Sequence, residues 1–224
     1  MEKNSQLSEY EEFLKKVFPD CRYNKEYDLL YKRVCSFNIF IEILKKYIND
    51  EKVEFFISKI TYGYNMLLMY VPLNDSLGIT ACMRYITEQT LKCFYSYIFK
   101  DKSIKEINET SYRHIKDDIK SKYTDKDCLN ILYSQYAKYS NEVHDKLKLE
   151  NKEIEYIYDI LSGENIMIEK INKDINILMK ILFIFLMKLN MNYSVYLKEQ
   201  IMKKFFQISF MRNSISYWNV KRQP

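Results

Sequence analysis

The sequence predicts an all-α protein. Only three glycines and three prolines occur in 224 residues, so turns that need a positive φ must be few, and a hairpin-rich sheet is disfavoured. Hydrophobic residues make up 47% of the chain and charged residues 29%, which is typical of a folded protein and not of a disordered one. Apolar residues also recur at intervals of three and four. Together these features indicate long helices with few connections.

Apolar periodicity and helix-end signals place the individual helices. We expect a first helix from Ser8 to Val17, where Ser8 and Glu11 form a capping-box pattern, and a second pattern of this kind at Thr124 and Asp127. Residues 100–123 are lysine-rich and suit a shorter helix with a loop. The other expected helices span residues 24–48, 53–71, 77–99, 124–144, 153–161, 166–189 and 193–206.

Composition also limits the compartment and the ligands. The five cysteines are an odd number without a CxxC pair, which favours buried free thiols in a reducing compartment. The polar N-terminal residues lack the apolar core of a secretory signal, and the most apolar run, 175–189, falls short of the ~20 residues that cross a bilayer. We therefore expect a cytoplasmic protein with no membrane partner. No metal cluster, phosphate loop or nucleophile elbow occurs in the sequence, so we expect no metal and no cofactor.

The first candidate functional residue is His144, one of only two histidines in the chain. It follows an apolar helix face at about 100° per residue. Because it lies one turn beyond Ser140, we expect it at the edge of the buried surface, where an imidazole with a pKa near ~6.5 can act as acid or base. Packing at a helix C-terminus, where the helix dipole favours imidazolium, is the alternative. The predicted face consists of Leu129, Leu132, Tyr133, Tyr136, Ala137, Ser140 and Val143.

A second candidate is the pair Arg84 and Glu88. Both fall within the apolar stripe of the helix expected over residues 77–99, instead of opposite it. A charged pair among apolar neighbours must be satisfied internally, either as a structural pair or within a site. The sequence leaves both interpretations open. The other members of the stripe are Leu77, Ala81, Leu91, Tyr95 and Ile98.

These two segments resemble the HEPN superfamily, small helical bundles found in prokaryotic toxins, antiphage proteins and ribonucleases. The residues that carry the resemblance are MRYITE at 83–88, with Leu91 and Lys92, and YSNEVH at 139–144. Active members are metal-independent endoribonucleases with an Arg-x4-6-His motif, in which two protomers form one cleft. Here the positions of that arginine hold Ala137, Lys138 and Tyr139, and lysine lacks the bidentate fork of arginine.

The resemblance implies an all-α, HEPN-like helical bundle with additional helices at both ends. Its core would span residues 50–150, with N-terminal helices at 1–49 packed on it and a C-terminal helical extension at 151–224. It further implies that the chain is a toxin or antiphage endoribonuclease that cleaves RNA. Metal-free cleavage needs an acid, a base and a cation at one phosphate. His144 would be the general acid or base, Arg84 would stabilise the phosphate, and the supporting residues would be Glu88, Lys138, Ser140 and Asn141.

The alternative function is a catalytically silent helical interaction subunit of a defence or toxin–antitoxin complex. In either case we expect a homodimer or a complex with a protein partner, because the resemblance implies assembly across two protomers.

The C-terminal residues provide a separate clue. Residues 200–224 contain five basic residues and no acidic one, which alone accounts for the net charge of +5. Aromatic residues are interleaved with these cations, a composition suited to stacking on bases and neutralising phosphates. Docking of the aromatics on the body of the protein is the alternative. The predicted nucleic-acid-binding residues are Lys203, Lys204, Arg212, Trp218, Lys221 and Arg222.

Overall fold

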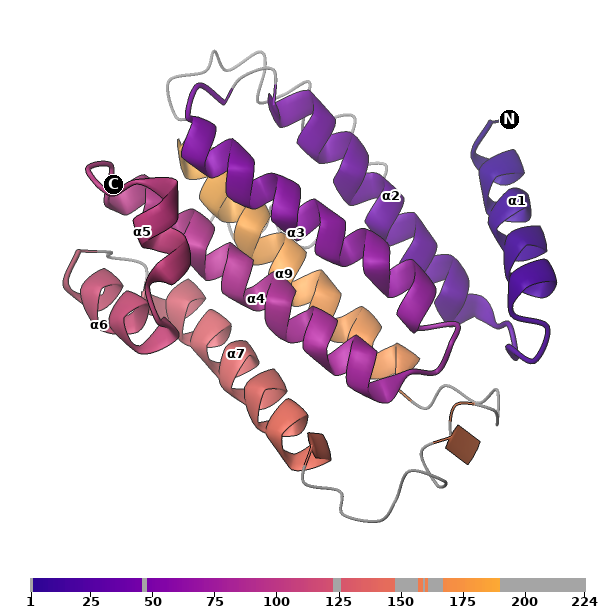
Figure 1. The fold of residues 1–224 in the computed structure, drawn as a ribbon. Helices are drawn as coiled ribbons and strands as arrows, with labels where there is room; N and C mark the ends of the chain where they lie inside the picture. The colour runs from indigo at the N-terminus through magenta and orange to yellow at the C-terminus, as the bar shows by residue number, and fades with distance from the viewer. Residues whose placement is uncertain are drawn as a thin grey trace.

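The computed structural model describes residues 2–45, 48–122, 126–147, 157–158, 160 and 167–189. Every regular element within these ranges is a helix, which confirms the all-α prediction (Figure 1). The helices are α1 (Glu2–Val17), α2 (Lys25–Lys45), α3 (Glu51–Tyr70), α4 (Ser76–Ile98), α5 (Ile104–Glu109), α6 (Tyr112–Lys122), α7 (Lys126–Leu147) and α9 (Ile168–Leu189). The expected helix at 153–161 is described only in part, and the one at 193–206 and the basic aromatic tail lie outside the described residues.

Side-chain caps fix where several helices begin. The Asp50 carboxylate accepts from the backbone N–H groups of Lys52 and Val53 at the start of α3, and a capping box opens α5. The capping box expected at Ser8 is wrong, because α1 already begins at Glu2 and Ser8 lies inside it. The residues ahead of Ser8 include Glu, Lys, Gln and Leu, which have good helix propensity and extend the helix toward the N-terminus.

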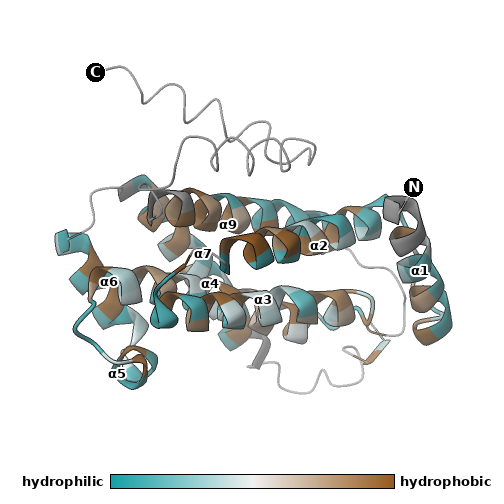
Figure 2. Ribbon diagram, turned by 90° about the horizontal axis from the view of Figure 1, so that it is seen from above, coloured by the Kyte–Doolittle hydropathy of each residue, from teal (hydrophilic) through white to brown (hydrophobic). Residues whose placement is uncertain are grey.

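Helix α4 occupies the centre of the bundle. It packs against α3 on one side and α7 on the other, and also contacts α5, α6 and α9. Helices α2 and α9 lie side by side over α3 and α4, and hydrophobic residues line the space between the two layers (Figure 2). All residues from 89 to 96 of α4 are buried, as expected for a helix with neighbours on every side.

The closest approach between α3 and α4 depends on Gly63. A Cβ atom at this position would lie 2.6 Å from Cγ1 of Ile86, well inside normal contact distance. The Gly63 carbonyl also accepts a hydrogen bond from the thiol of Cys82 at 3.0 Å. The absence of a side chain therefore allows the two helices to pack together closely.

The predicted apolar stripe of α4 is correct in its second half and wrong in its first. Leu91 and Tyr95 are buried, whereas Ala81 is exposed. The reason is that α3 packs through Gly63 onto a neighbouring face of α4. In that half the buried hydrophobic residues are Ile79, Cys82, Met83 and Ile86.

The predicted face of α7 also needs one correction. Ala137 is exposed, whereas Tyr139 is fully buried. Helix α9 contacts α7 and covers the side that carries Tyr139. The helical period places residues around the axis, but the neighbouring helices decide which side is covered.

Buried tyrosines give the fold a predicted sensitivity to alkali. Burial raises the pKa of Tyr112 and of Tyr133 to about 12 and raises the pKa of the fully buried Tyr64 further. The unfolded chain releases the same protons near pH ~10. The contribution of these groups to stability is therefore complete below about pH 10 and is lost as the pH rises from about 10 to 12.

We expect the urea midpoint of the wild type to fall over that range while it changes little between about pH 7 and 9. In Tyr64→Phe the urea midpoint should fall less over this alkaline range than in the wild type. The Tyr64 hydroxyl is buried without a hydrogen-bond partner, so its removal leaves no other group unsatisfied. The matched control is Tyr62→Phe, since Tyr62 is 61% exposed. If the urea midpoint falls equally steeply with pH in both variants, the alkaline loss of stability does not come from Tyr64.

Candidate functional site

The two predicted catalytic residues lie on neighbouring helices but not at one site. The Arg84 guanidinium lies over the Tyr136 ring, with Cζ 5.7 Å from the ring centroid and Nη2 3.5 Å from the hydroxyl. His144 is eight residues beyond Tyr136 on α7, about 12 Å along the helix axis, and its side chain is exposed. Within one chain, Arg84 therefore packs against an aromatic ring two helical turns away from His144.

Glu88 is paired with a residue other than the predicted one. Its carboxylate lies 2.8 Å from the ammonium of Lys92, which is buried and also donates to the Asn108 carbonyl at 2.9 Å. The expectation that Glu88 holds Arg84 is therefore wrong. The physical reason is orientation, because a glutamate four residues before a lysine makes a better helical pair than an arginine four residues before a glutamate.

The predicted supporting residues on α7 lie in three different environments. Lys138 makes an ion pair of 2.5 Å with Asp174 of α9, which neutralises its charge. Ser140 is half-buried, and Asn141 is exposed. A phosphate at this helix would thus compete with Asp174 for Lys138.

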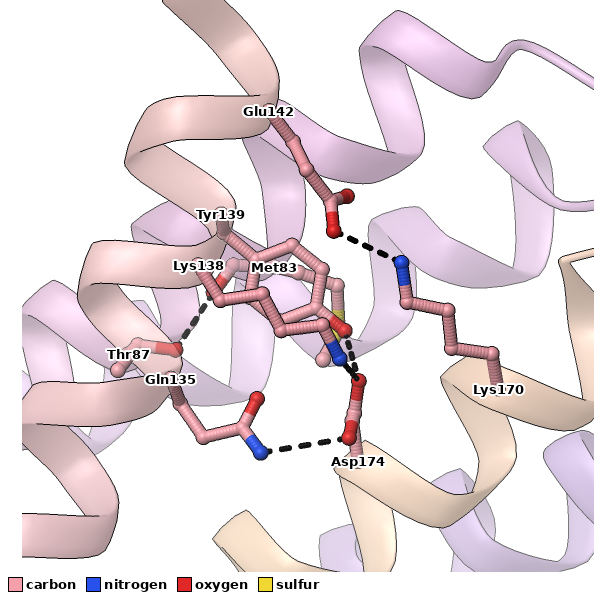
Figure 3. Close-up of polar contacts among 8 residues, drawn as sticks. All are labelled: Met83, Thr87, Gln135, Lys138, Tyr139, Glu142, Lys170 and Asp174. Atoms are coloured by element: carbon pink, nitrogen blue, oxygen red, sulfur yellow. Dashed lines mark hydrogen bonds and ion pairs between the residues drawn. The ribbon is translucent and has the colours of Figure 1, made fainter.

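A buried polar cluster around Asp174 is the main feature that the sequence reasoning missed (Figure 3). Its carboxylate accepts hydrogen bonds from the Tyr139 hydroxyl, from Lys138 and, at 3.3 Å, from the Gln135 amide. Asp174 is only 6% exposed. Each donor comes from α7, and Gln135, Lys138 and Tyr139 are spaced at i, i+3 and i+4, so one carboxylate of α9 binds three side chains on the same side of the facing helix.

The chemistry of this cluster is structural. Burial, followed by the hydrogen bond to Asp174, raises the pKa of Tyr139, so this phenol does not give up its proton near neutral pH. Both oxygens of the carboxylate accept hydrogen bonds, and Asp174 lines none of the three pockets found among the described residues. A second pair, Glu142 with Lys170 at 2.8 Å, joins the same two helices closer to the surface. Asp174 thus stabilises the contact between α7 and α9.

One sequence signal could have indicated Asp174. It lies between Ile171, Ile175 and Leu178, all fully buried, on the apolar face of its helix. A lone acid on such a face requires an internal partner. The packing of α7 on α9 decides which residue is that partner, and the spacing of residues in the sequence does not reveal this packing.

The described residues show no metal centre. They include no group of three or more histidine, cysteine, aspartate or glutamate side chains that could hold an ion. The five cysteines are free thiols, three of them buried. Among the described helices, none has the length and hydrophobicity needed to cross a membrane.

Comparison with protein-family models, curated proteins and solved structures finds no match to this chain. The resemblance to the HEPN superfamily therefore stays a prediction.

Removal of the Asp174 carboxylate should destabilise the fold strongly. Asp174→Ala leaves the buried Tyr139 hydroxyl without an acceptor and Lys138 without its counter-ion, so we expect a loss of roughly 2–4 kcal/mol in the free energy of unfolding. Urea unfolding monitored by circular dichroism measures this loss. The matched control is Glu142→Gln, which breaks the more exposed pair between the same helices and should cost less than about 1 kcal/mol. Similar losses in both variants would mean that the Asp174 cluster contributes no more to stability than the exposed pair does.

Proposed function

We propose that this protein is a catalytically silent helical interaction subunit, the second of the two functions expected from the sequence. The observation that supports this proposal is the use of the predicted catalytic residue Arg84, and of two predicted supporting residues, in internal contacts, while His144 is exposed. Glu88 is paired with Lys92, Lys138 is paired with Asp174, and Arg84 packs on Tyr136. Membership of a defence or toxin–antitoxin complex is supported by the HEPN resemblance alone.

The requirements of RNA cleavage explain why these contacts count against catalysis. Without a metal ion, a base, an acid and a cation must act on the same phosphate within hydrogen-bonding reach. Arg84 and Lys138 are the predicted cations. Arg84 packs on the Tyr136 ring, about 12 Å along the helix from the imidazole of His144. Lys138 forms an ion pair with the Asp174 carboxylate. A ribonuclease would need a second copy to supply the missing groups.

The decisive experiment is an RNA cleavage assay with the purified full chain in the presence of a chelator. We expect wild type to leave a mixed RNA pool intact, as His144→Ala and Arg84→Ala also should. His114→Ala is the matched control, because His114 is the other histidine and is exposed on α6. Cleavage that is lost in His144→Ala and retained in His114→Ala would overturn the proposal.

Growth provides an independent readout. Expression of the wild type should slow cells no more than expression of His144→Ala does. Growth arrest that His144→Ala relieves, and His114→Ala does not, would restore the ribonuclease interpretation.

A further inference from the structure

The part of the α3–α4 hairpin around its connection is almost free of charge. Between Lys59 and Arg84 the sequence contains 24 residues, of which only Asp75 is charged, whereas the chain average of 29% would give about seven. The Asp75 carboxylate is used as the N-cap of α4, where it accepts from the Gly78 N–H at 2.7 Å. The charge-free segment thus covers the end of α3, the connection and the start of α4.

Part of this segment faces outward as an apolar surface. On α3, Tyr62, Met66 and Met69 recur at intervals of four and three, the spacing with which helices pack against one another. Tyr62 is 61% exposed and Met69 is 39% exposed. We call the surface formed by Tyr62, Met66, Met69, Tyr70, Ala81 and Tyr85 the uncharged face.

A pocket of about 190 Å³ opens within the uncharged face. Tyr62 and Tyr85 belong to its walls, which come from α3 and α4, respectively, and the small residues Gly63, Gly78 and Ala81 also line it. The face therefore combines a protruding aromatic side chain with a neighbouring hole that can receive an apolar one. This is the combination found at the centre of protein interfaces.

We propose that a second copy of this chain docks on the uncharged face to form a two-fold dimer. The proposal deepens the interaction function proposed above and rests on it, since it names the partner. The absence of charge on this face permits the choice. Two chains that each carry a net charge of +5 repel one another in general, but this face brings no like charges together and removes no ionised group from water.

The shape of the face is also suited to self-association. In a two-fold interface the same surface is used twice, so a side chain that protrudes from one copy must find its hole on the same face of the other. Tyr62 and the pocket beside it meet this condition. Nucleic acid does not fit, because the face offers no lysine or arginine to neutralise phosphates.

Sedimentation velocity of the full chain over a range of concentrations tests the proposal. The wild type should dimerise, and Tyr62→Lys should weaken self-association by roughly 30-fold or more, the effect of a hot-spot residue. Tyr85→Lys, on the other wall of the pocket, should act in the same direction. The matched control is Ile39→Lys, which places the same charge on an apolar residue of α2 that is 54% exposed and lies outside the uncharged face. It should leave the dimer intact.

Several outcomes would overturn the proposal. These are a monomeric wild type, a dimer that survives both Tyr62→Lys and Tyr85→Lys, or equal disruption by Ile39→Lys. A monomer that floats with neutral phosphatidylcholine vesicles would assign the uncharged face to a membrane instead. Circular dichroism and urea midpoints verify that each variant folds. If the wild type cleaves RNA and Tyr62→Lys abolishes its dimer, only the proposed lack of catalytic activity is refuted. The dimer proposal would stand.

Discussion

The burial of the second half of α4 on every side, over residues 89–96, is the constraint on which the rest of the structure depends. A helix without a solvent face must satisfy its polar side chains internally. The hydroxyls of Thr87 and Thr90 do so by donating to backbone carbonyls one turn earlier, and the buried Lys92 does so through Glu88 and Asn108. The side chains of Thr87, Thr90 and Lys92 are thereby engaged in internal contacts.

The same reasoning extends to the contact between α7 and α9. Asp174 enters an apolar face of α9 and is compensated by three donors from α7, so the cost of its desolvation is offset where the two helices meet. Hydrogen bonds of this kind specify one relative position of two helices, which apolar packing alone does not require. Lys138 belongs to this arrangement, which explains why a phosphate would have to compete with Asp174 for the cation close in sequence to His144.

The sequence predicted the existence and the approximate limits of the long helices because their apolar periods are strong and few breakers interrupt them. It did not predict the pairing of the candidate site. Glu88 has a possible partner one turn before it and another one turn after it, and the period alone does not choose between Arg84 and Lys92. Tyr139 and Asp174 are 35 residues apart, so only the folded bundle brings them together. Helix content is a local property, whereas a site is a property of packing.

The two halves of α4 consequently have different chemical roles. Its second half, buried throughout residues 89–96, lies within the core and engages Lys92 with Glu88. Its first half, with Ala81 and Tyr85, lies beside the outward face of α3 and carries no charged residue before Arg84 apart from the Asp75 cap that precedes it. An uncharged surface offers a phosphate no cation and does not steer a charged ligand, but it costs little to desolvate. If the chain acts by binding, the favourable free energy should come from burying this face, because few groups there need compensation when water leaves.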